Sequence, residues 1–328
     1  MNNTTKLRIL MVCCLVPVVC APFAGMSFIS PGEIFATGSP DAEVFRRLRL
    51  PRTVAAFFAG AGLSVAGMLF QAMFRNPLAT PFTLGISGGA AFGASLYVYL
   101  GAGAAFGVSG GIWAAPAGAL LSMLLVWALT RSRGAFSTPV LLLSGVIINF
   151  FFSSLVMLLQ YLSRADDSLR IMHWLMGSLA VPDIARVSDM VFVVLAGFVF
   201  VGRLAPALDL LSAGEELAAS RGVEVGRVKL WVFLAASLMV GVIVSLAGPI
   251  GFVGMMVPHV CRRMLGRRHG LLLPGAFVLG GAFLVVCDLG ARTLFAPAEL
   301  PIGIITALLG GPFFLWVLFR GGGRGVML

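Results

Sequence analysis

Long runs of apolar residues that carry no charge dominate the pattern along the chain. Asp, Glu, Lys and Arg are absent from six stretches, at residues 9–32, 53–74, 76–130, 134–163, 230–261 and 300–319. A helix that crosses a membrane needs about 20 consecutive apolar residues, so the stretch 76–130 must hold more than one crossing. Apolar runs of this length are not typical of globular cores. The pattern therefore predicts a polytopic membrane protein.

The predicted elements are helices, because only helices and closed barrels satisfy every backbone polar group in lipid. We expect ten membrane segments, at residues 7–29, 53–74, 81–100, 110–130, 138–161, 187–204, 229–247, 253–266, 272–292 and 302–320. Segment 253–266 is short and follows a Gly-Pro-Ile-Gly turn, which indicates a broken or half-length helix. The apolar stretch 171–182 is too short to cross and contains Trp174, which is typical of a helix at the outer membrane surface. The sequence thus predicts an all-α fold with a single transmembrane domain over residues 1–328.

The basic residues set the expected orientation. The chain has 23 Lys and Arg residues against 13 Asp and Glu. Ten crossings place both termini on one side, and with the termini inside, 15 of the 23 basic residues lie in inner loops. Cytoplasmic loops are enriched in Lys and Arg, so we expect both termini in the cytoplasm and the chain in the inner (plasma) membrane, surrounded by lipid. Because the basic residues form short clusters between apolar runs, no nucleic-acid partner is expected.

Glycines indicate how the helices touch. Gly85, Gly89 and Gly93 repeat every four residues, and Gly60 and Gly67 lie in the preceding segment. Such spacing lets helix backbones approach closely in lipid. Close packing is the preferred interpretation, and glycines bordering a pathway are the alternative.

The lysines bear on the energy source. The chain has only Lys6 and Lys229, and neither follows a glycine, so a phosphate-binding loop ending in Gly-Lys-Ser/Thr is absent from the sequence. If ATP drives this protein, a separate chain must hydrolyse it. We expect no catalytic residue and no metal site. The five cysteines are odd in number and show no paired spacing, so we interpret them as small buried hydrophobic side chains.

One soluble stretch has an unusual composition. In residues 212–222, Glu215 and Glu216 open a short Ala-rich helix that Gly222 can end in left-handed geometry. The face that follows the two glutamates, which includes Ala219, is small and smooth and suits the groove of a partner. An ordinary solvated loop helix is the alternative. The whole loop, at about 205–228, is expected in the cytoplasm.

Four motifs occur in order along the chain. They are Arg49-Leu50-Pro51-Arg52-Thr53, Gln71-Ala72-Met73-Phe74-Arg75-Asn76-Pro77-Leu78-Ala79, Gly251-Phe252-Val253-Gly254 with Val257-Pro258-His259, and Glu299-Leu300-Pro301-Ile302-Gly303 with Gly310-Gly311-Pro312. Their order and spacing resemble the permease family of ABC importers for ferric siderophores, heme and cobalamin, over about residues 46–320. The resemblance implies the type II ABC importer permease fold.

The resemblance also implies how such a chain works. It would be a transport subunit and not an enzyme, without a covalently bound cofactor. It would act as a homodimer with two ATP-binding cassette ATPase subunits, which use the ATP, and with a periplasmic substrate-binding protein. Iron chelates (ferric siderophore or heme) lead among the ligands, with cobalamin as the alternative.

Residue roles carry over from the family to matching positions. Arg49, Arg52 and Arg292 are expected to dock the binding protein, since Arg presents a planar fork to carboxylates. Interfacial anchoring is the alternative for these arginines, and for Arg292 also a helical ion pair with Asp288.

The cytoplasmic gate and the ATPase contact carry over in the same way. The gate matches Asn76, Leu78, Ser137 and Thr138, and the last two are alternatively a simple helix N-cap. The coupling helices, which press on the ATPase subunits, match residues 212–222, with the contacts expected at Glu215, Glu216, Ala219 and Gly222.

Two functions of other classes compete. Gly85-Ile86-Ser87-Gly88 matches the nucleophile pattern of intramembrane serine proteases, with His259 as the candidate base. An ion-coupled secondary transporter usually has an ionisable residue at mid-membrane. Asp288 is the one acid well inside an apolar run, and it lies near an outer helix end with Arg292 beside it.

Overall fold

The computed structural model describes residues 3–25, 29–30, 32, 34, 39–101, 103–132, 138–180 and 184–321. In this part of the chain the regular structure is entirely helical. The elements are α1 (Asn3–Cys20), α2 (Pro40–Val44), η2 (Phe45–Arg49), α3 (Leu50–Phe74), η3 (Pro81–Leu84), α4 (Ile86–Tyr99), α5 (Gly103–Ser132), α6 (Thr138–Leu162), α7 (Ala165–Leu175), α8 (Ile184–Gly202), α9 (Ala205–Ala213), α10 (Glu215–Ser220), α11 (Val225–Ala247), α12 (Val253–Leu265), α13 (His269–Thr293) and α14 (Ile302–Gly321).

Seven helices of the described chain are long and apolar enough to cross a membrane, and Ile302–Val317 is a shorter apolar helix. Helix α12 has 13 residues, which confirms the predicted half-length helix. The expected full crossing at 81–100 is instead a short turn of 3₁₀-helix, η3, followed by the 14-residue α4. Gly85, between them, has a φ of 77°, so the chain cannot continue as one helix there.

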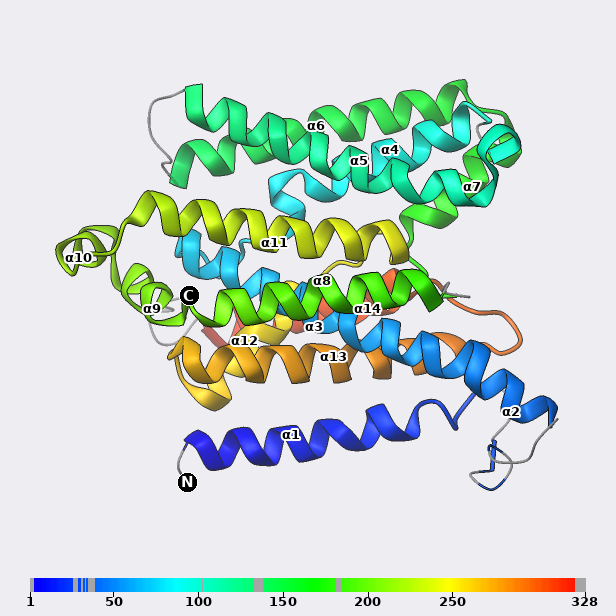
Figure 1. Ribbon diagram of the computed structural model, residues 1–328, viewed down its shortest axis with the longest axis horizontal. Helices are drawn as coiled ribbons and strands as arrows, with labels where there is room; N and C mark the ends of the chain where they lie inside the picture. Colours follow the sequence, from blue (N-terminus) through cyan, green and yellow to red (C-terminus); the bar gives the residue numbers. More distant parts are fainter. Residues whose placement is uncertain are drawn as a thin grey trace.

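The long helices run side by side along the longest axis of the molecule (Figure 1). Helix α1 begins at the end of the bundle that carries α9 and α10, and α2 and α7 lie at the opposite end (Figure 1). The start of α1 and the loop at 205–228 therefore share one side, as the sequence predicts. We call the α9–α10 end the inner end and the α2–α7 end the outer end.

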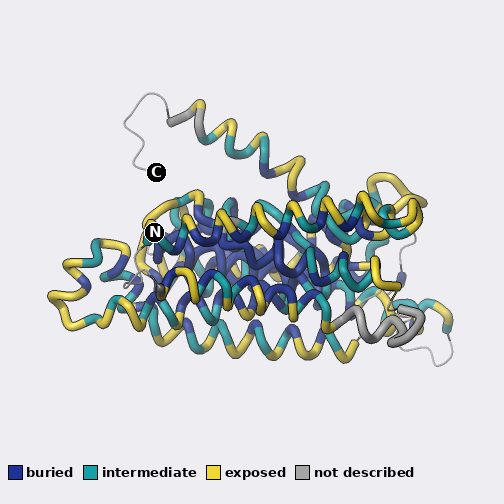
Figure 2. Tube along the Cα trace, turned by 90° about the horizontal axis from the view of Figure 1, so that it is seen from above, coloured by how far each residue is buried: buried dark blue, intermediate teal, exposed yellow. Residues whose placement is uncertain are grey.

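Helix α3 lies at the centre of the bundle, where it packs against α8, α11, α12 and α13. Its buried face consists largely of small residues, including Ala55, Ala56 and Ala59, which are fully buried. Large apolar side chains such as Phe150 on α6 and Phe192 on α8 are exposed at the periphery of the bundle instead. Figure 2 shows this arrangement, with buried residues concentrated at the centre of the bundle. Small residues inside and large apolar residues outside are favourable in a membrane, because lipid solvates large apolar side chains and small ones allow close helix contact.

The glycines make close backbone contacts. A Cβ added to Gly67 would collide with the carbonyl oxygen of Gly254, and one on Gly89 would collide with that of Gly118. Gly60 meets Gly280 in the same way. These contacts join α3 to α12 and α13, and α4 to α5, and they confirm that the glycines serve packing.

The short outer helix begins earlier than expected. It is α7, at Ala165–Leu175, and not residues 171–182. Asp166 and Asp167 occupy its first turn, where the helix dipole favours negative charge. Gly177, with a φ of 71°, turns the chain away after the helix. The start signal in these two acidic residues was thus available in the sequence.

Helix α14 leaves the body of the bundle at an angle (Figure 2). It packs mainly against α12 and α13. Leu308, Leu315 and Phe319 are exposed along it. A cavity of about 450 Å³ lies at its base, lined mostly by apolar side chains that include Phe252 and Ile304. The helix therefore presents apolar surface outside the body of the bundle.

Candidate functional site

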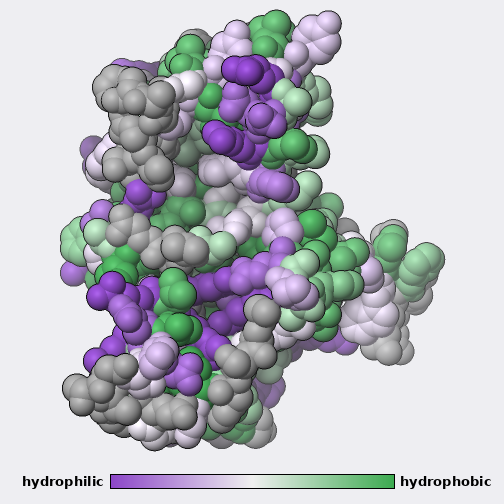
Figure 3. Space-filling model, turned by 90° about the vertical axis from the view of Figure 1, so that its right-hand side faces the viewer, coloured by the Kyte–Doolittle hydropathy of each residue, from purple (hydrophilic) through white to green (hydrophobic). Residues whose placement is uncertain are grey.

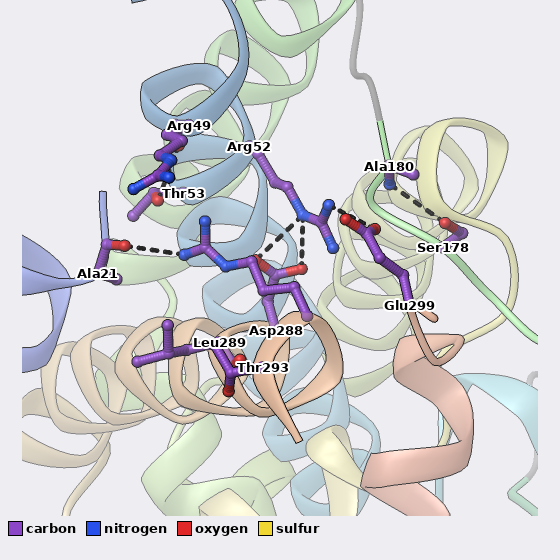
Figure 4. Close-up of polar contacts among 11 residues, drawn as sticks. Ala21, Arg49, Arg52, Thr53, Ser178, Ala180, Asp288, Leu289, Thr293 and Glu299 are labelled. Atoms are coloured by element: carbon purple, nitrogen blue, oxygen red, sulfur yellow. Dashed lines mark hydrogen bonds and ion pairs between the residues drawn. The ribbon is translucent and has the colours of Figure 1, made fainter. Parts of the chain in front are cut away.

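Two polar clusters occupy opposite ends of the bundle, and the first surrounds Arg52 at the outer end. The Arg52 Nε atom donates to both carboxylate oxygens of Asp288, at 2.9 and 3.2 Å. Its Nη1 atom donates to Glu299 Oε2 at 2.8 Å. Figure 4 shows Arg52, from α3, lying between Asp288 on α13 and Glu299 in the loop before α14. One guanidinium group thus binds two carboxylates from different segments.

Arg292 is the second arginine of this cluster. Its Nη2 atom donates to the carbonyl oxygen of Ala21 at 2.9 Å, and its Nε atom lies 3.6 Å from Asp288 Oδ2. The helical ion pair with Asp288, which the sequence offered as the alternative to docking for Arg292, is therefore present. The side chain of Asp288 is 2% exposed. A buried carboxylate is tolerated when cations neutralise it, and Arg52 and Arg292 do so here.

A cavity of about 300 Å³ opens beside these side chains at the outer end. Arg49, Arg52, Arg292 and Glu299 line it together with Gly25, Val44, Leu48 and Ala180. Arg49 also donates to the carbonyl oxygen of Phe23 at 3.1 Å. Seen from this end, hydrophilic side chains form patches among apolar ones (Figure 3). The structure thus brings the three arginines of the docking prediction to one cavity, and their docking role stays a prediction.

The second cluster lies at the inner end and joins residues from three helices. Glu215 Oε2, on α10, lies 2.7 Å from Lys229 Nζ on α11. The hydroxyl of Thr138, at the start of α6, donates to Glu215 Oε1 at 3.1 Å and accepts a hydrogen bond from Lys229 Nζ, also at 3.1 Å. The side chain of Lys229 is 1% exposed, whereas that of Glu215 is 38% exposed. A residue of the predicted gate and one of the predicted coupling helix therefore contact each other directly.

The environment of Glu215 stabilises its charged form. Partial burial opposes ionisation, but hydrogen bonds and charge from Lys229, with smaller contributions from Thr138 and Arg75, outweigh it. The pKa of Glu215 is therefore held below its ordinary value.

The other predicted gate residues form a turn at the end of α3. Arg75 has a φ of 49°, which ends the helix in left-handed geometry. Asn76 Oδ1 then accepts a hydrogen bond from the backbone N–H of Leu78 at 2.9 Å. Leu78 is exposed at the inner end, and Asn76 lies in the same turn. Ser137 lies outside the described residues.

The coupling segment has the predicted helix end. Gly222 has a φ of 83°, and the N–H of Val223 donates to the carbonyl oxygen of Ala218 at 3.0 Å. Glu216, Ala219 and Gly222 are exposed, whereas Ala218 is fully buried within the chain. Leu217 is also exposed and is the large apolar side chain of this surface. Leu217 was missed from the sequence, although its apolar side chain stands there between charged and small residues.

The family follows from comparison with known proteins. The profile of the FecCD transport family matches residues 10–320. The chain belongs to the FecCD transport family. The uncharacterized ABC transporter permease protein YvrB of Bacillus subtilis (strain 168) is 39% identical to it over 290 residues, covering 86% of this chain and 81% of YvrB. The vitamin B12 import system permease protein BtuC of Escherichia coli O139:H28 is 38% identical over 317 residues, covering 96% of this chain and 94% of BtuC.

Solved structures agree with the FecCD assignment. A structure described as an inward-facing conformation of a metal-chelate type ABC transporter has a TM-score of 0.88 and 31% identity, covering 97% of this chain and 99% of the other. PsaBC from Streptococcus pneumoniae, at a TM-score of 0.56 and 16% identity over 84% of this chain and 92% of the other, shares the fold alone. The chain is thus an all-helical, multi-pass permease subunit of an ABC importer with the type II fold. It is not itself an enzyme and binds no cofactor, and a partner ATPase uses the ATP.

In the FecCD fold, the surroundings of the residues considered for the two competing functions do not match either function. Ser87 is buried, and its hydroxyl has no hydrogen-bond partner among the described residues. His259 packs edge-on against Phe313, with ring centroids 5.8 Å apart. Asp288 is bound by two arginines near the outer end, which is unlike an ion-coupling acid at mid-membrane.

Two polar side chains of this FecCD permease, Asp209 and Gln71, make contacts that were missed from the sequence. Asp209 Oδ1 on α9 accepts from the backbone N–H of His269 at 2.8 Å and lies 2.6 Å from its Nδ1 atom. Gln71, buried on α3, donates to the carbonyl oxygen of Gly254 and accepts from Arg262. No local pattern pairs residues this distant in the chain, so only the fold reveals them.

Proposed function

We propose that this FecCD-family permease imports a metal chelate of the cobalamin class from the periplasm into the cytoplasm. The observation that carries this proposal is the 38% identity to the vitamin B12 permease BtuC across 96% of this chain. Ferric siderophores and heme, which the sequence placed first, become the second candidate. They are supported by the similarity to a transporter described as of metal-chelate type.

The proposed assembly is a homodimer bound to two ATPase subunits, in the inner membrane with both termini cytoplasmic. Helix α14 supports it, because the helix diverges from the body of the bundle (Figure 2) and carries the exposed apolar residues Leu308, Leu315 and Phe319, which a second copy would bury. The whole chain would act as one transmembrane domain with the translocation path on the two-fold axis. The inner excess of basic residues supports the orientation.

At the outer end, we assign docking of the binding protein to Arg49, Arg52 and Arg292. They line one cavity open to that end, and carboxylates of a partner match the planar guanidinium group. At the inner end, the exposed surface of Glu216, Leu217, Ala219 and Gly222 would contact the ATPase. The Thr138–Glu215–Lys229 cluster would transmit movement of the ATPase-bound helix α10 to the gate at Asn76, Leu78, Ser137 and Thr138.

Uptake by the reconstituted complex tests the ligand. The permease would be co-expressed with its own ATPase and binding protein, purified as a complex and placed in liposomes holding ATP. Uptake of labelled cyanocobalamin that exceeds uptake of a ferric siderophore and of heme supports the proposal. Uptake of a ferric chelate without cobalamin would establish the second candidate instead.

A further inference from the structure

Arg52 holds its two carboxylates very differently. The side chain of Asp288 is 2% exposed and receives two hydrogen bonds from Nε, whereas that of Glu299 is 45% exposed and receives one from Nη1. Glu299 also lines the outer cavity, and Asp288 does not. Solvent competes more effectively for an exposed ion pair than for a buried one. Asp288 is therefore the more firmly held partner of Arg52, and Glu299 is the partner that solvent reaches more easily.

Glu299 stands at the entrance to α14. The N–H of Leu300 donates to the carbonyl oxygen of Ala291 on α13, at 3.0 Å. The N–H of Ile302, the first residue of α14, donates to that of Gly177 at 3.1 Å. The contact between Arg52 and Glu299 adds a side-chain link from α3 to this segment. Because α14 packs mainly on α12 and α13, such a link just before its first turn affects how firmly the helix is held.

We propose that the ion pair between Arg52 and Glu299 is an exchangeable latch, in which Glu299 occupies the place of a docking carboxylate until the binding protein arrives. This inference rests on the proposed docking function. The incoming carboxylate enters the cavity lined by Arg49, Arg52 and Arg292 and displaces Glu299 from Nη1. Docking thereby frees the segment that leads into α14, while Asp288 keeps Arg52 in position.

The latch makes Glu299 a competitor of its own partner protein. Replacing it with glutamine removes the competing charge and leaves the cavity and Asp288 in place. The Glu299→Gln variant should bind the cognate binding protein about two- to fivefold more tightly, the range that an exposed ion pair supplies. In the permease without its binding protein, the amide hydrogens of Ala298, Glu299, Leu300 and Ile302 should exchange faster than in the wild type.

The test measures affinity for the binding protein and, in the absence of the binding protein, amide exchange of the detergent-solubilised permease, with two comparison variants. Glu43→Gln is the matched control, because Glu43 is an exposed outer acid paired with Arg47 and outside the cavity, and it should leave affinity and exchange unchanged. The double variant Arg49→Glu/Arg52→Glu tests docking itself. If it weakens binding while Glu299→Gln leaves affinity and exchange at wild-type values, the latch is wrong and docking stands. If it leaves binding intact, both ideas are wrong.

Discussion

The hydroxyl of Thr138 and the carboxylate of Glu215 lie 3.1 Å apart, so the first residue of α6 is bonded to the first residue of α10. Lys229 binds both groups from α11. A displacement of α10 by a partner must therefore move α6 or break charge-assisted hydrogen bonds. This contact joins the proposed ATPase surface to the proposed gate through side chains alone.

Replacing Lys229 should uncouple these helices. Lys229→Met keeps an apolar stem of similar length and removes the donor to Thr138 and Glu215. Hydrogen bonds to charged groups contribute about 1.5–3 kcal/mol, so the linked state should lose roughly tenfold or more of its population. Ligand uptake per ATP hydrolysed, measured in liposomes, should fall. Lys6→Met, the same change at the other lysine, should not lower it, and equal coupling in both variants would contradict the role of Lys229.

The Glu215 contact should have a defined pH dependence. The folded pKa of Glu215 lies below its ordinary value of 4.5, so its contribution to stability is present above pH 4.5 and is lost as pH falls through the folded pKa. The melting temperature of the wild type minus that of Glu215→Gln should be constant from neutral pH down to about 4.5 and shrink below it. A difference that already disappears near neutral pH would show that Glu215 is not held in its charged form.

The coupling surface should reject a bulky side chain. Ala219 is exposed, so Ala219→Trp leaves the packing of the single chain intact. Overfilling a close interface costs typically 1–3 kcal/mol, which lowers ATPase affinity roughly tenfold to a hundredfold. Pull-down of the ATPase and stimulated ATP hydrolysis measure this. Arg203→Trp, at an exposed position of the same end, is the control, and wild-type activity in both variants would make residues 212–222 a solvated loop only.

Asp288 should matter for stability far more than Glu299. Asp288→Asn leaves the partly buried Arg52 and the buried Arg292 without their shared carboxylate. Removing one partner of a buried ion pair costs about 3–5 kcal/mol. Thermal unfolding in detergent should show a large loss for Asp288→Asn and little change for the exposed control Asp166→Asn. Similar melting temperatures for the two variants would mean that the cluster is solvated.

Close backbone contact predicts a difference between two glycine-to-alanine changes. Gly67→Ala places a methyl group against the carbonyl of Gly254, whereas a Cβ on Gly226 meets no other group within 4 Å. Overpacking should destabilise the first variant by about 1–3 kcal/mol. The second should be neutral or slightly stabilising, because alanine favours a helix over glycine. Paired unfolding measurements in detergent check this, and a neutral Gly67→Ala would show that α3 and α12 can separate at no cost.

The sequence by itself determined the membrane character, the helical class, most crossings and the family. Charge-free runs longer than a bilayer crossing permit few alternatives, and the half-length α12 followed from its length and its Gly-Pro flank. These properties depend on residues near one another in the chain, so a local pattern is sufficient to predict them. The four ordered motifs added the positions of the arginines, the gate and the coupling loop.

The tertiary structure decided which of these residues meet. Arg52 and Asp288 lie 236 positions apart, and Thr138 and Glu215 lie 77 apart. A buried charge pairs with the opposite charge that helix packing places nearby. Close glycine contacts determine how these helices pack. The sequence showed Glu299 and Lys229 only as a motif residue and a rare lysine. Their ion pairs with Arg52 and Glu215 exist because α3, α13 and the segment before α14 converge at one end, and α6, α10 and α11 at the other.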